Sequence, residues 1–183
     1  HIGTRLGSRR LLLKPAHSPG CTETANAAVT AGRRLTMQEL PHLYRAGAQG
    51  EPEGHVHVSA DAVETIVTAP PPEFGGPGDR WSPETLLVAA IANCFVLSFR
   101  AIARASRLPW TSLDCHADGK LERIGGTMKF TEFVVHATLH VPPGTSEEKA
   151  HRILERAETT CLVSNSMSAS RRLNAMINVV SSP

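Results

Sequence analysis

The fold of this protein is decided by one stretch, WSPETLLVAAIANCFVLSFRAIARAS, residues 81–106. It predicts a long helix, because Ser82 is a suitable N-cap, Pro83 fits the first helical position and Glu84 lies in the first turn. A helix of this length extends roughly 35 Å at 1.5 Å per residue. Apolar residues cover nearly every face from Leu86 to Phe99. We therefore expect a central helix, covered by a sheet on one side and by another helix or subunit on the other.

The segments around this helix predict strands and one further helix. Strands that end at three prolines are expected in HVHVSADAVETIVTAPPP, residues 55–72. A β-hairpin about the Gly125-Gly126 turn is expected in LDCHADGKLERIGGTMKFTEFVVHATLHVPPG, residues 113–144. Ser146 caps a second helix, whose apolar stripe includes Cys161 and directs this thiol toward the core. A helical turn and a last strand follow, and this order of elements indicates an α+β domain.

The length and composition of the chain predict one domain preceded by a different kind of segment. With 183 residues, 41% of them hydrophobic, the chain is sufficient for a single core, which we expect to span residues 37–183. Residues 1–36 contain six Lys or Arg, a single acidic residue, Glu23, and no sustained period. We expect a disordered leader, or an extension foreign to a native protein that begins at Met37.

The charge and hydropathy of the sequence argue against nucleic-acid and membrane binding. The formal net charge is only +2, with basic residues scattered among nearly as many acidic ones. The longest apolar run, Leu86 to Phe99, is fourteen residues long, is interrupted by Asn93 and Ser98, and is shorter than a membrane span. We therefore expect a soluble, cytoplasmic protein whose four cysteines are thiols rather than a disulfide framework.

Two of the cysteines, Cys94 and Cys161, lie at positions expected to be buried in the two helices. A free Cys commonly packs as a small hydrophobe, so a purely structural interpretation is available for each. Polar neighbours, Asn93, Ser164 and Asn165, lie beside them where a plain core favours apolar groups. Helices packed 8–10 Å apart can bring two sulfurs within disulfide reach. We expect Cys115 to be structural, and Cys21 falls in the leader.

The histidines form pairs along the expected strands but do not match a metal motif. His55 and His57 share one strand face, as do His136 and His140, and His116 directly follows Cys115. Neither C-x-x-C nor H-E-x-x-H spacing accompanies these pairs, and zinc needs three or four convergent ligands. We expect exposed strand positions to explain the histidines, and no metal or cofactor to be bound.

Two segments resemble the signatures of a known family. These are GGPGDRWSPETLLVAAIANCF, residues 75–95, and CLVSN, residues 161–165. Both resemble the OsmC/Ohr family, the osmotically inducible and organic hydroperoxide resistance proteins, and the resemblance covers about Leu43 to Val180. It implies an intertwined α+β homodimer, in which central buried helices pack against antiparallel sheets and two active sites lie at the subunit interface.

The resemblance also implies thiol-dependent reduction of peroxides. Cys94 would attack the O–O bond of a hydroperoxide as a thiolate and become a sulfenic acid. Cys161 would condense with it to a disulfide, which a dithiol reductant, lipoyl-type in the family, would reopen. The apolar surroundings of Cys94 favour an organic hydroperoxide over hydrogen peroxide, because burial of an alkyl chain adds binding free energy.

The family activates its nucleophile with an Arg that is held by the Glu of a Pro-Glu motif, and Glu84 matches this Glu. About 15 Å of straight helix separates Glu84 from Cys94, so the resemblance implies an orienting role through an Arg. Simple stabilisation of the helix dipole is the structural alternative. The stretch that corresponds to the family's Arg, AQGEPEGHV at residues 48–56, contains no Arg, which leaves Arg45 and Arg80 as substitutes. This gap favours an alternative function, a non-catalytic OsmC-fold protein that binds a small molecule or senses redox state.

Overall fold

The computed structural model describes residues 39–180 of the chain. The described residues from Tyr44 onward belong to one compact unit, and residues 39–43 fall outside it. The leader expected at residues 1–36 lies outside the described residues. Both that leader and the single domain over residues 37–183 therefore stay predictions.

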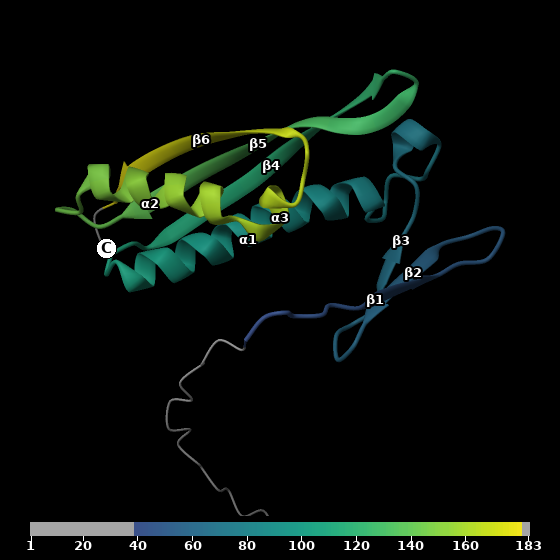
Figure 1. The fold of residues 1–183 in the computed structure, drawn as a ribbon, viewed down its shortest axis with the longest axis horizontal. Coiled ribbons are helices and arrows are strands. Elements are labelled where there is room, and N and C mark those ends of the chain that lie inside the picture. The colour runs from purple at the N-terminus through teal and green to yellow at the C-terminus, as the bar shows by residue number, and fades with distance from the viewer. Residues whose placement is uncertain (1–38, 181–183) are drawn as a thin grey trace, which may run out of the picture. The chain divides into compact units, whose positions relative to one another are not determined.

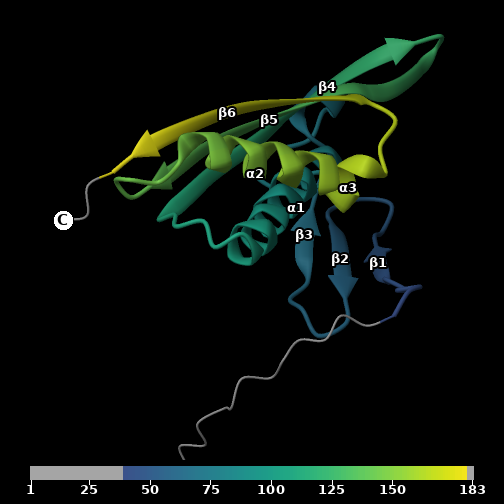
Figure 2. The ribbon, with the colours of Figure 1, turned by 60° about the vertical axis from the view of Figure 1, so that its left-hand side comes forward.

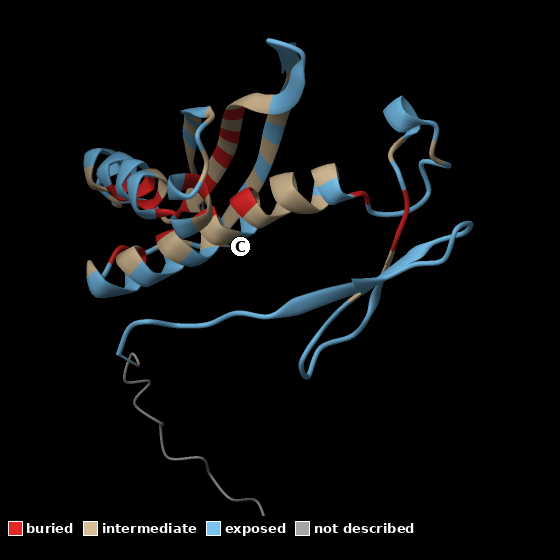
Figure 3. Cartoon of the chain, turned by 45° about the vertical axis from the view of Figure 1, so that its right-hand side comes forward, coloured by how far each residue is buried: buried red, intermediate tan, exposed pale blue. Residues whose placement is uncertain are grey.

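The first described elements are three short strands in one antiparallel sheet. They are β1 (Ala46–Gln49), β2 (Val56–Ala60) and β3 (Ile66–Thr68), and they lie in that order. The prediction of strands at β2 and β3 is confirmed, whereas β1 was missed, because its sequence AGAQ lacks the β-branched and aromatic residues typical of strands. Most residues of this sheet are exposed within the described chain (Figure 3), whereas Val58 and Val67 are half-buried and Thr68 is buried.

The loop between β3 and the long helix is closed by a backbone hydrogen bond. The N–H of Ala69 donates to the carbonyl of Trp81 at 3.0 Å. Inside the loop, a Cβ at Gly76 would lie 1.6 Å from the carbonyl oxygen of Pro70, so this position accepts only glycine. A short 3₁₀ helix, η1 (Pro72–Phe74), lies in the same loop. These contacts hold together the two ends of the segment that leads into the helix.

Helix α1 (Pro83–Ala105) begins as the sequence predicts. The Ser82 hydroxyl accepts a hydrogen bond from the N–H of Thr85 at 3.2 Å, and the N–H of Ser82 donates to the Thr85 hydroxyl at 2.9 Å. This is a capping box with Thr in the place usually taken by Glu or Gln. The carboxylate of Glu84 is therefore not used for capping and remains available for another role.

Within this chain, α1 is covered along only one side. Its buried residues are Ile91, Phe95, Phe99 and Ala103, which recur at helical spacing. The expectation that the helix is covered all round is thus not met by the single chain. The helix has 23 residues, and an 18-residue window reaches a mean hydropathy of 2.1. By length and composition alone such a helix could cross a membrane, although the core helix of a soluble protein meets the same criterion, and the sequence-based estimate had counted only the uninterrupted apolar run.

The second sheet contains the predicted hairpin and the last strand. β4 (Ser112–Ile124) and β5 (Thr127–Val141) pair antiparallel through a turn whose Gly125 and Gly126 have φ of 57° and 85°. Two consecutive positive φ angles are characteristic of a type I′ turn. β6 (Ser170–Val179) pairs with β5 in parallel, so the sheet β4–β5–β6 is mixed. The expectation of antiparallel sheets holds for β1–β3 and for the hairpin, but not for β6.

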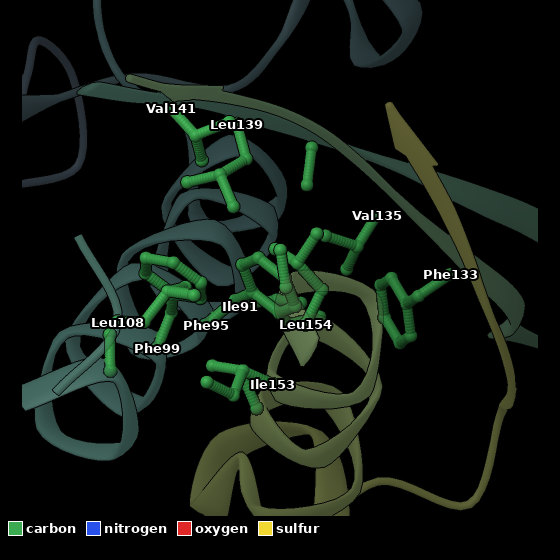
Figure 4. Close-up of a cluster of buried hydrophobic side chains, with 14 residues drawn as sticks. Ile91, Phe95, Phe99, Leu108, Phe133, Val135, Leu139, Val141, Ile153 and Leu154 are labelled. Carbon is green, nitrogen blue, oxygen red and sulfur yellow. The ribbon is translucent and has the colours of Figure 1, made fainter. Parts of the chain in front are cut away.

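The helices lie on one face of the β4–β5–β6 sheet (Figures 1 and 2). α2 (Glu147–Thr160) and the short α3 (Leu162–Asn165) connect β5 to β6, and α2 packs against α1. Such a crossover of helices is what a parallel strand pair requires. The core lies between these helices and the inward residues of β5 (Figure 4), which are Phe133, Val135, Ala137, Leu139 and Val141.

Candidate functional site

Cys94 lies in the middle of α1, beside its buried stripe. Its neighbour Phe95 is fully buried, whereas Cys94 itself is half-buried. Ser98, one helical turn further on, hydrogen-bonds to the Cys94 sulfur. The helix therefore holds this thiol at the edge of the core, where its sulfur retains contact with the surface.

Cys161 lies at the break between α2 and α3. It is the C-cap of α2 and the N-cap of α3, in an extended conformation with φ of −63° and ψ of 111°. The prediction that this thiol is directed into the core is confirmed, since Cys161 is only 1% exposed. The hydroxyl of Ser164 donates a hydrogen bond to its sulfur at 3.2 Å.

The Cys94 and Cys161 side chains are both free thiols and hydrogen-bond to one another. Burial alone raises the pKa of Cys94, but hydrogen bonds from Cys161, from the backbone N–H groups of Val163 and Leu162, and from Ser98 outweigh it. The net effect is a pKa of Cys94 below the ordinary value of a cysteine thiol. Cys161 and the first residues of α3 therefore stabilise a thiolate at Cys94 on α1.

The other two thiols in the described residues are shifted in the opposite direction. Burial, and then the hydrogen bond with Cys94, raise the pKa of Cys161, although Ser164 acts against this. Burial, with a contribution from the charge of Cys161, raises the pKa of Cys115 to about 11. Of these three cysteines, only Cys94 has a pKa below the ordinary value, which favours the nucleophilic thiolate form.

Glu84 faces an apolar cavity of about 520 Å³ between α1, the loop before it and β4. Its Oε2 atom is fully buried and has no hydrogen-bond partner among the described residues. The cavity walls are formed mainly by apolar side chains, including Val88, Ala92 and Phe130. Cys115 also contributes to the lining, whereas Cys94 does not. Among the described residues, the Glu84 carboxyl group thus faces this cavity without a cationic partner.

The structure does not bring either candidate arginine to Glu84 within the described chain. The guanidinium of Arg80 pairs with Asp79, at 3.2 Å to its carboxylate and 2.8 Å to its carbonyl oxygen. Arg45 is exposed and lies directly before β1. Within the part of the chain that the structure describes, Glu84 is therefore not paired with an arginine.

Three groups at the thiol pair were not predicted as site residues. The backbone N–H groups of Leu162 and Val163 could not be predicted, because they depend on how α3 packs against α1. Ser98 was treated only as an interruption of an apolar run. Its position four residues after Cys94 was a usable signal, since such residues are neighbours on a helix.

Comparison with known proteins identifies the family of this chain. A model of the family described as OsmC-like protein matches residues 76–175, more than half of the sequence. The uncharacterized protein YmaD of Bacillus subtilis (strain 168) is 22% identical over 112 residues, which cover 60% of this chain and 75% of the relative. The residues matched by the family model include α1, the hairpin and α2.

Solved structures share the fold. An OsmC-like protein of unknown function from Vibrio cholerae has a TM-score of 0.68 at 19% identity, over 74% of this chain and 100% of that chain. The organic hydroperoxide resistance protein OsmC from Legionella pneumophila has a TM-score of 0.62 at 23% identity, over 77% of this chain and 100% of that chain. At these identities the likeness establishes the fold alone. The family match and the shared α+β fold together show that this chain belongs to the OsmC-like protein family.

Proposed function

We propose that this protein is a thiol-dependent reductase of organic hydroperoxides, with Cys94 as the peroxidatic and Cys161 as the resolving cysteine. The observation that carries the proposal is the hydrogen-bonded pair of free thiols, in which the pKa of Cys94 is lowered and that of Cys161 is raised. A catalytic thiol of this kind has to be both ionised and accessible. Cys94 meets both requirements, being half-buried and stabilised as a thiolate.

The reaction has three balanced steps. The Cys94 thiolate attacks the terminal oxygen of the hydroperoxide, the O–O bond breaks, and the released alkoxide takes a proton to leave as an alcohol. The sulfur has then lost two electrons and is a sulfenic acid. The Cys161 thiol displaces water from it and forms the disulfide. An external dithiol, of lipoyl type, returns two electrons and two protons by thiol–disulfide exchange.

An organic substrate is favoured by the surface beside Cys94. Leu97, three residues after Cys94 on α1, is 52% exposed. Leu162, whose backbone N–H donates a hydrogen bond to the Cys94 sulfur, is 75% exposed. Covering such side chains with an alkyl group stabilises a complex by roughly 25 cal/mol per Å² of apolar surface. Hydrogen peroxide has no apolar part that can gain this free energy. The name of the Legionella pneumophila neighbour, an organic hydroperoxide resistance protein, agrees with this choice.

The active form is a soluble, cytoplasmic homodimer in this proposal. The uncovered side of α1 and the exposed β1–β3 sheet need a cover, and a second copy of the chain supplies apolar surface of the same kind. The membrane-like composition of α1 is then explained by burial between subunits rather than in lipid. Glu84 orients an arginine toward Cys94, and Arg45 or Arg80 takes this role on assembly.

Single-turnover oxidation tests the proposal. The reduced protein is mixed with one equivalent of cumene hydroperoxide or of hydrogen peroxide, and thiols are counted while peptide mapping locates any disulfide. We expect rapid loss of two thiols per chain, a Cys94–Cys161 disulfide, and faster reaction with the organic peroxide. Cys94→Ser abolishes the reaction, whereas Cys161→Ser leaves a sulfenic acid at Cys94. Cys115→Ser is the matched control and reacts as the wild type does.

A non-catalytic role as a small-molecule-binding or redox-sensing protein is the second candidate. It is favoured by one observation, the absence of an arginine beside Glu84 within the described chain. If the protein only binds a small molecule, both thiols survive equimolar peroxide for minutes. If it is a redox sensor, the disulfide forms once, but an excess of dithiol and peroxide gives no multiple turnover.

A further inference from the structure

The outer face of the β4–β5–β6 sheet, opposite the helices, carries a cluster of side chains that the proposed peroxidase does not use. Residues on this face alternate with the buried ones along β4 and β5. His116 lies directly opposite His136 in the strand pairing, and Asp118 follows two residues after His116 on the same face. The three side chains therefore converge from two strands.

The ligand atoms of these residues are close enough for one metal ion. One nitrogen of each imidazole and one carboxylate oxygen all lie within 4.8 Å of one another. His136 Nε2 is 3.0 Å from Asp118 Oδ2, and the two imidazole rings are stacked with centroids 4.6 Å apart. Ligands of a tetrahedral zinc ion lie about 3.3 Å apart, given metal–ligand distances of about 2.0–2.1 Å. Rotation of side chains that are partly exposed is sufficient to close this difference.

A β-bulge produces this arrangement. Lys120 pairs with Glu132 while Leu121 pairs with Phe130, so that Thr131 is an extra residue in β5. Without the bulge, the register of the Gly125-Gly126 turn would place residue 135 opposite His116. Val135 is directed into the core. The extra residue thus brings two histidines, twenty positions apart in the sequence, onto directly opposite positions of one face.

Asn174 of β6 provides the outer partner that a metal-binding histidine needs. It lies opposite His136 in the strand pairing, and its side-chain amide is 3.4 Å from His136 Nδ1. When Nε2 binds a metal, Nδ1 carries the proton and requires an acceptor. The Asn174 side-chain amide can donate to Nδ1 when the metal is absent, and after a flip it can accept from Nδ1–H when the metal is bound. In both cases the hydrogen bond holds His136 Nε2 toward Asp118.

The electrostatic surroundings also favour a cation. The positive side chains nearest to the cluster on the same face are already paired, Lys120 with Glu122 at 3.0 Å and Arg172 with Glu132 at 2.9 Å. Asp118 is 70% exposed, so it can turn from His136 toward an ion. A hollow of about 500 Å³ lies beside the two histidines and Asn174 and gives water and ions access. Imidazole and carboxylate ligands together suit first-row transition metals.

We propose that His116, Asp118 and His136 form a binding site for a divalent first-row transition metal ion, with Zn²⁺ as the representative, in which Asn174 orients His136. Water completes the coordination on the open side. This departs from the expectation of no metal site, which was based on local motif spacing. The bound ion links β4 to β5 on the side of the bulge away from the turn and is independent of the thiol chemistry on the other face of the sheet.

Calorimetric titration with Zn²⁺ tests the proposal. The full-length chain carries Cys94→Ser and Cys161→Ser, so that these thiols do not compete for the metal. We expect His116→Ala, His136→Ala and Asp118→Asn each to weaken zinc binding at least about tenfold, and Asn174→Ala to weaken it by about tenfold. Zn²⁺ raises the Tm of the parent but not of the ligand variants. Mg²⁺ has no such effect, because it prefers oxygen ligands.

A second His–Asp pair on the same face provides the matched control. His140 Nε2 lies 3.4 Å from Asp114 Oδ2. Among the described residues, no third His, Cys, Asp or Glu joins this pair to make a possible metal site. His140→Ala therefore leaves the affinity for Zn²⁺ unchanged. Failure of the parent to bind Zn²⁺ at millimolar concentration would overturn the proposal. Equal affinities of the parent and the Asp118→Asn and His116→Ala variants, or an equal loss in His140→Ala, would do so as well. The far-UV circular dichroism of each variant in EDTA establishes that it is folded, and the near-isosteric Asp118→Asn guards against misfolding of the alanine variants.

Discussion

The substitution Glu84→Gln tests whether the buried carboxyl group of Glu84 is unpaired or is paired with a cation in the assembled protein. Glu84 Oε2 is fully buried and has no hydrogen-bond partner among the described residues, although the side chain faces an apolar cavity. Glutamine has nearly the same shape and keeps one acceptor, but it removes the charge and places an amide NH₂ donor at the second position. The change therefore alters the electrostatics of the site with little effect on its packing.

The size of the stability change follows from whether a cation is present. For the chain alone, an unpaired amide replaces an unpaired carboxyl group, and the change loses only about 0.3–1 kcal/mol of helix-dipole stabilisation. The effect on stability is then small. With an arginine in place, the change instead removes a charge-assisted hydrogen bond of about 1.5–3 kcal/mol. A change of 1 kcal/mol moves the Tm of a chain of this size by about 2–4 °C.

We expect Glu84→Gln to lower the Tm by several degrees and to slow the oxidation of Cys94 by on the order of 100-fold, as misplacement of a positioned group does. Thermal denaturation and stopped-flow oxidation by cumene hydroperoxide measure the two effects. Glu73→Gln, at an exposed position in the loop before α1 and in the lining of the same cavity, is the control. A Tm within about a degree of the wild type together with an unchanged rate would refute both the pairing and the orienting role.

Two further predictions concern the thiol and the helix–sheet contact. Because the pKa of Cys94 is lowered, its thiolate persists below the ordinary pKa of about 8.5, and the rate of peroxide reduction falls only as the pH drops through the pKa of Cys94. Thiolate absorbance followed against pH checks this, with Cys94→Ser removing the low transition and Cys115→Ser leaving it, since the pKa of Cys115 is about 11. Gly119→Ala places a Cβ 2.8 Å from both Phe130 and Val88, and we expect it to lower the free energy of unfolding by about 1–3 kcal/mol. In denaturant titrations Gly47→Ala, whose Cβ would meet nothing nearer than 3.9 Å, stays close to wild type.

Features with a local cause could be predicted from the sequence. The start of α1 depends on Ser82 and Pro83 alone, and the hairpin turn depends on two glycines that accept positive φ. The stripe of α2 follows from helical periodicity, which also directed Cys161 inward. In each case the signal lies within a few residues of the feature that it specifies.

Features that depend on pairing between distant segments could not be predicted. The parallel placement of β6 beside β5 is decided by the return path through α2 and α3, which leaves no mark on the sequence of β6. The bulge at Thr131 shifts the register of half the hairpin, so counting outward from the turn misplaces His136 by one residue. The family resemblance predicted Cys94 and Cys161 as a pair, but the groups that lower the pKa of Cys94 come from the packing of α3.

The exposed β1–β3 sheet has a consequence for the cellular behaviour of the protein. A three-stranded sheet with neither face covered has little stability of its own. If a second copy covers it, folding of this segment and association of two chains are a single bimolecular event. The concentration of the protein in the cell would then determine what fraction of the chains is dimeric and fully folded. At low expression, unpaired chains would remain incompletely folded and exposed to proteolysis, so the amount of fully folded protein would rise more steeply than in proportion to its expression.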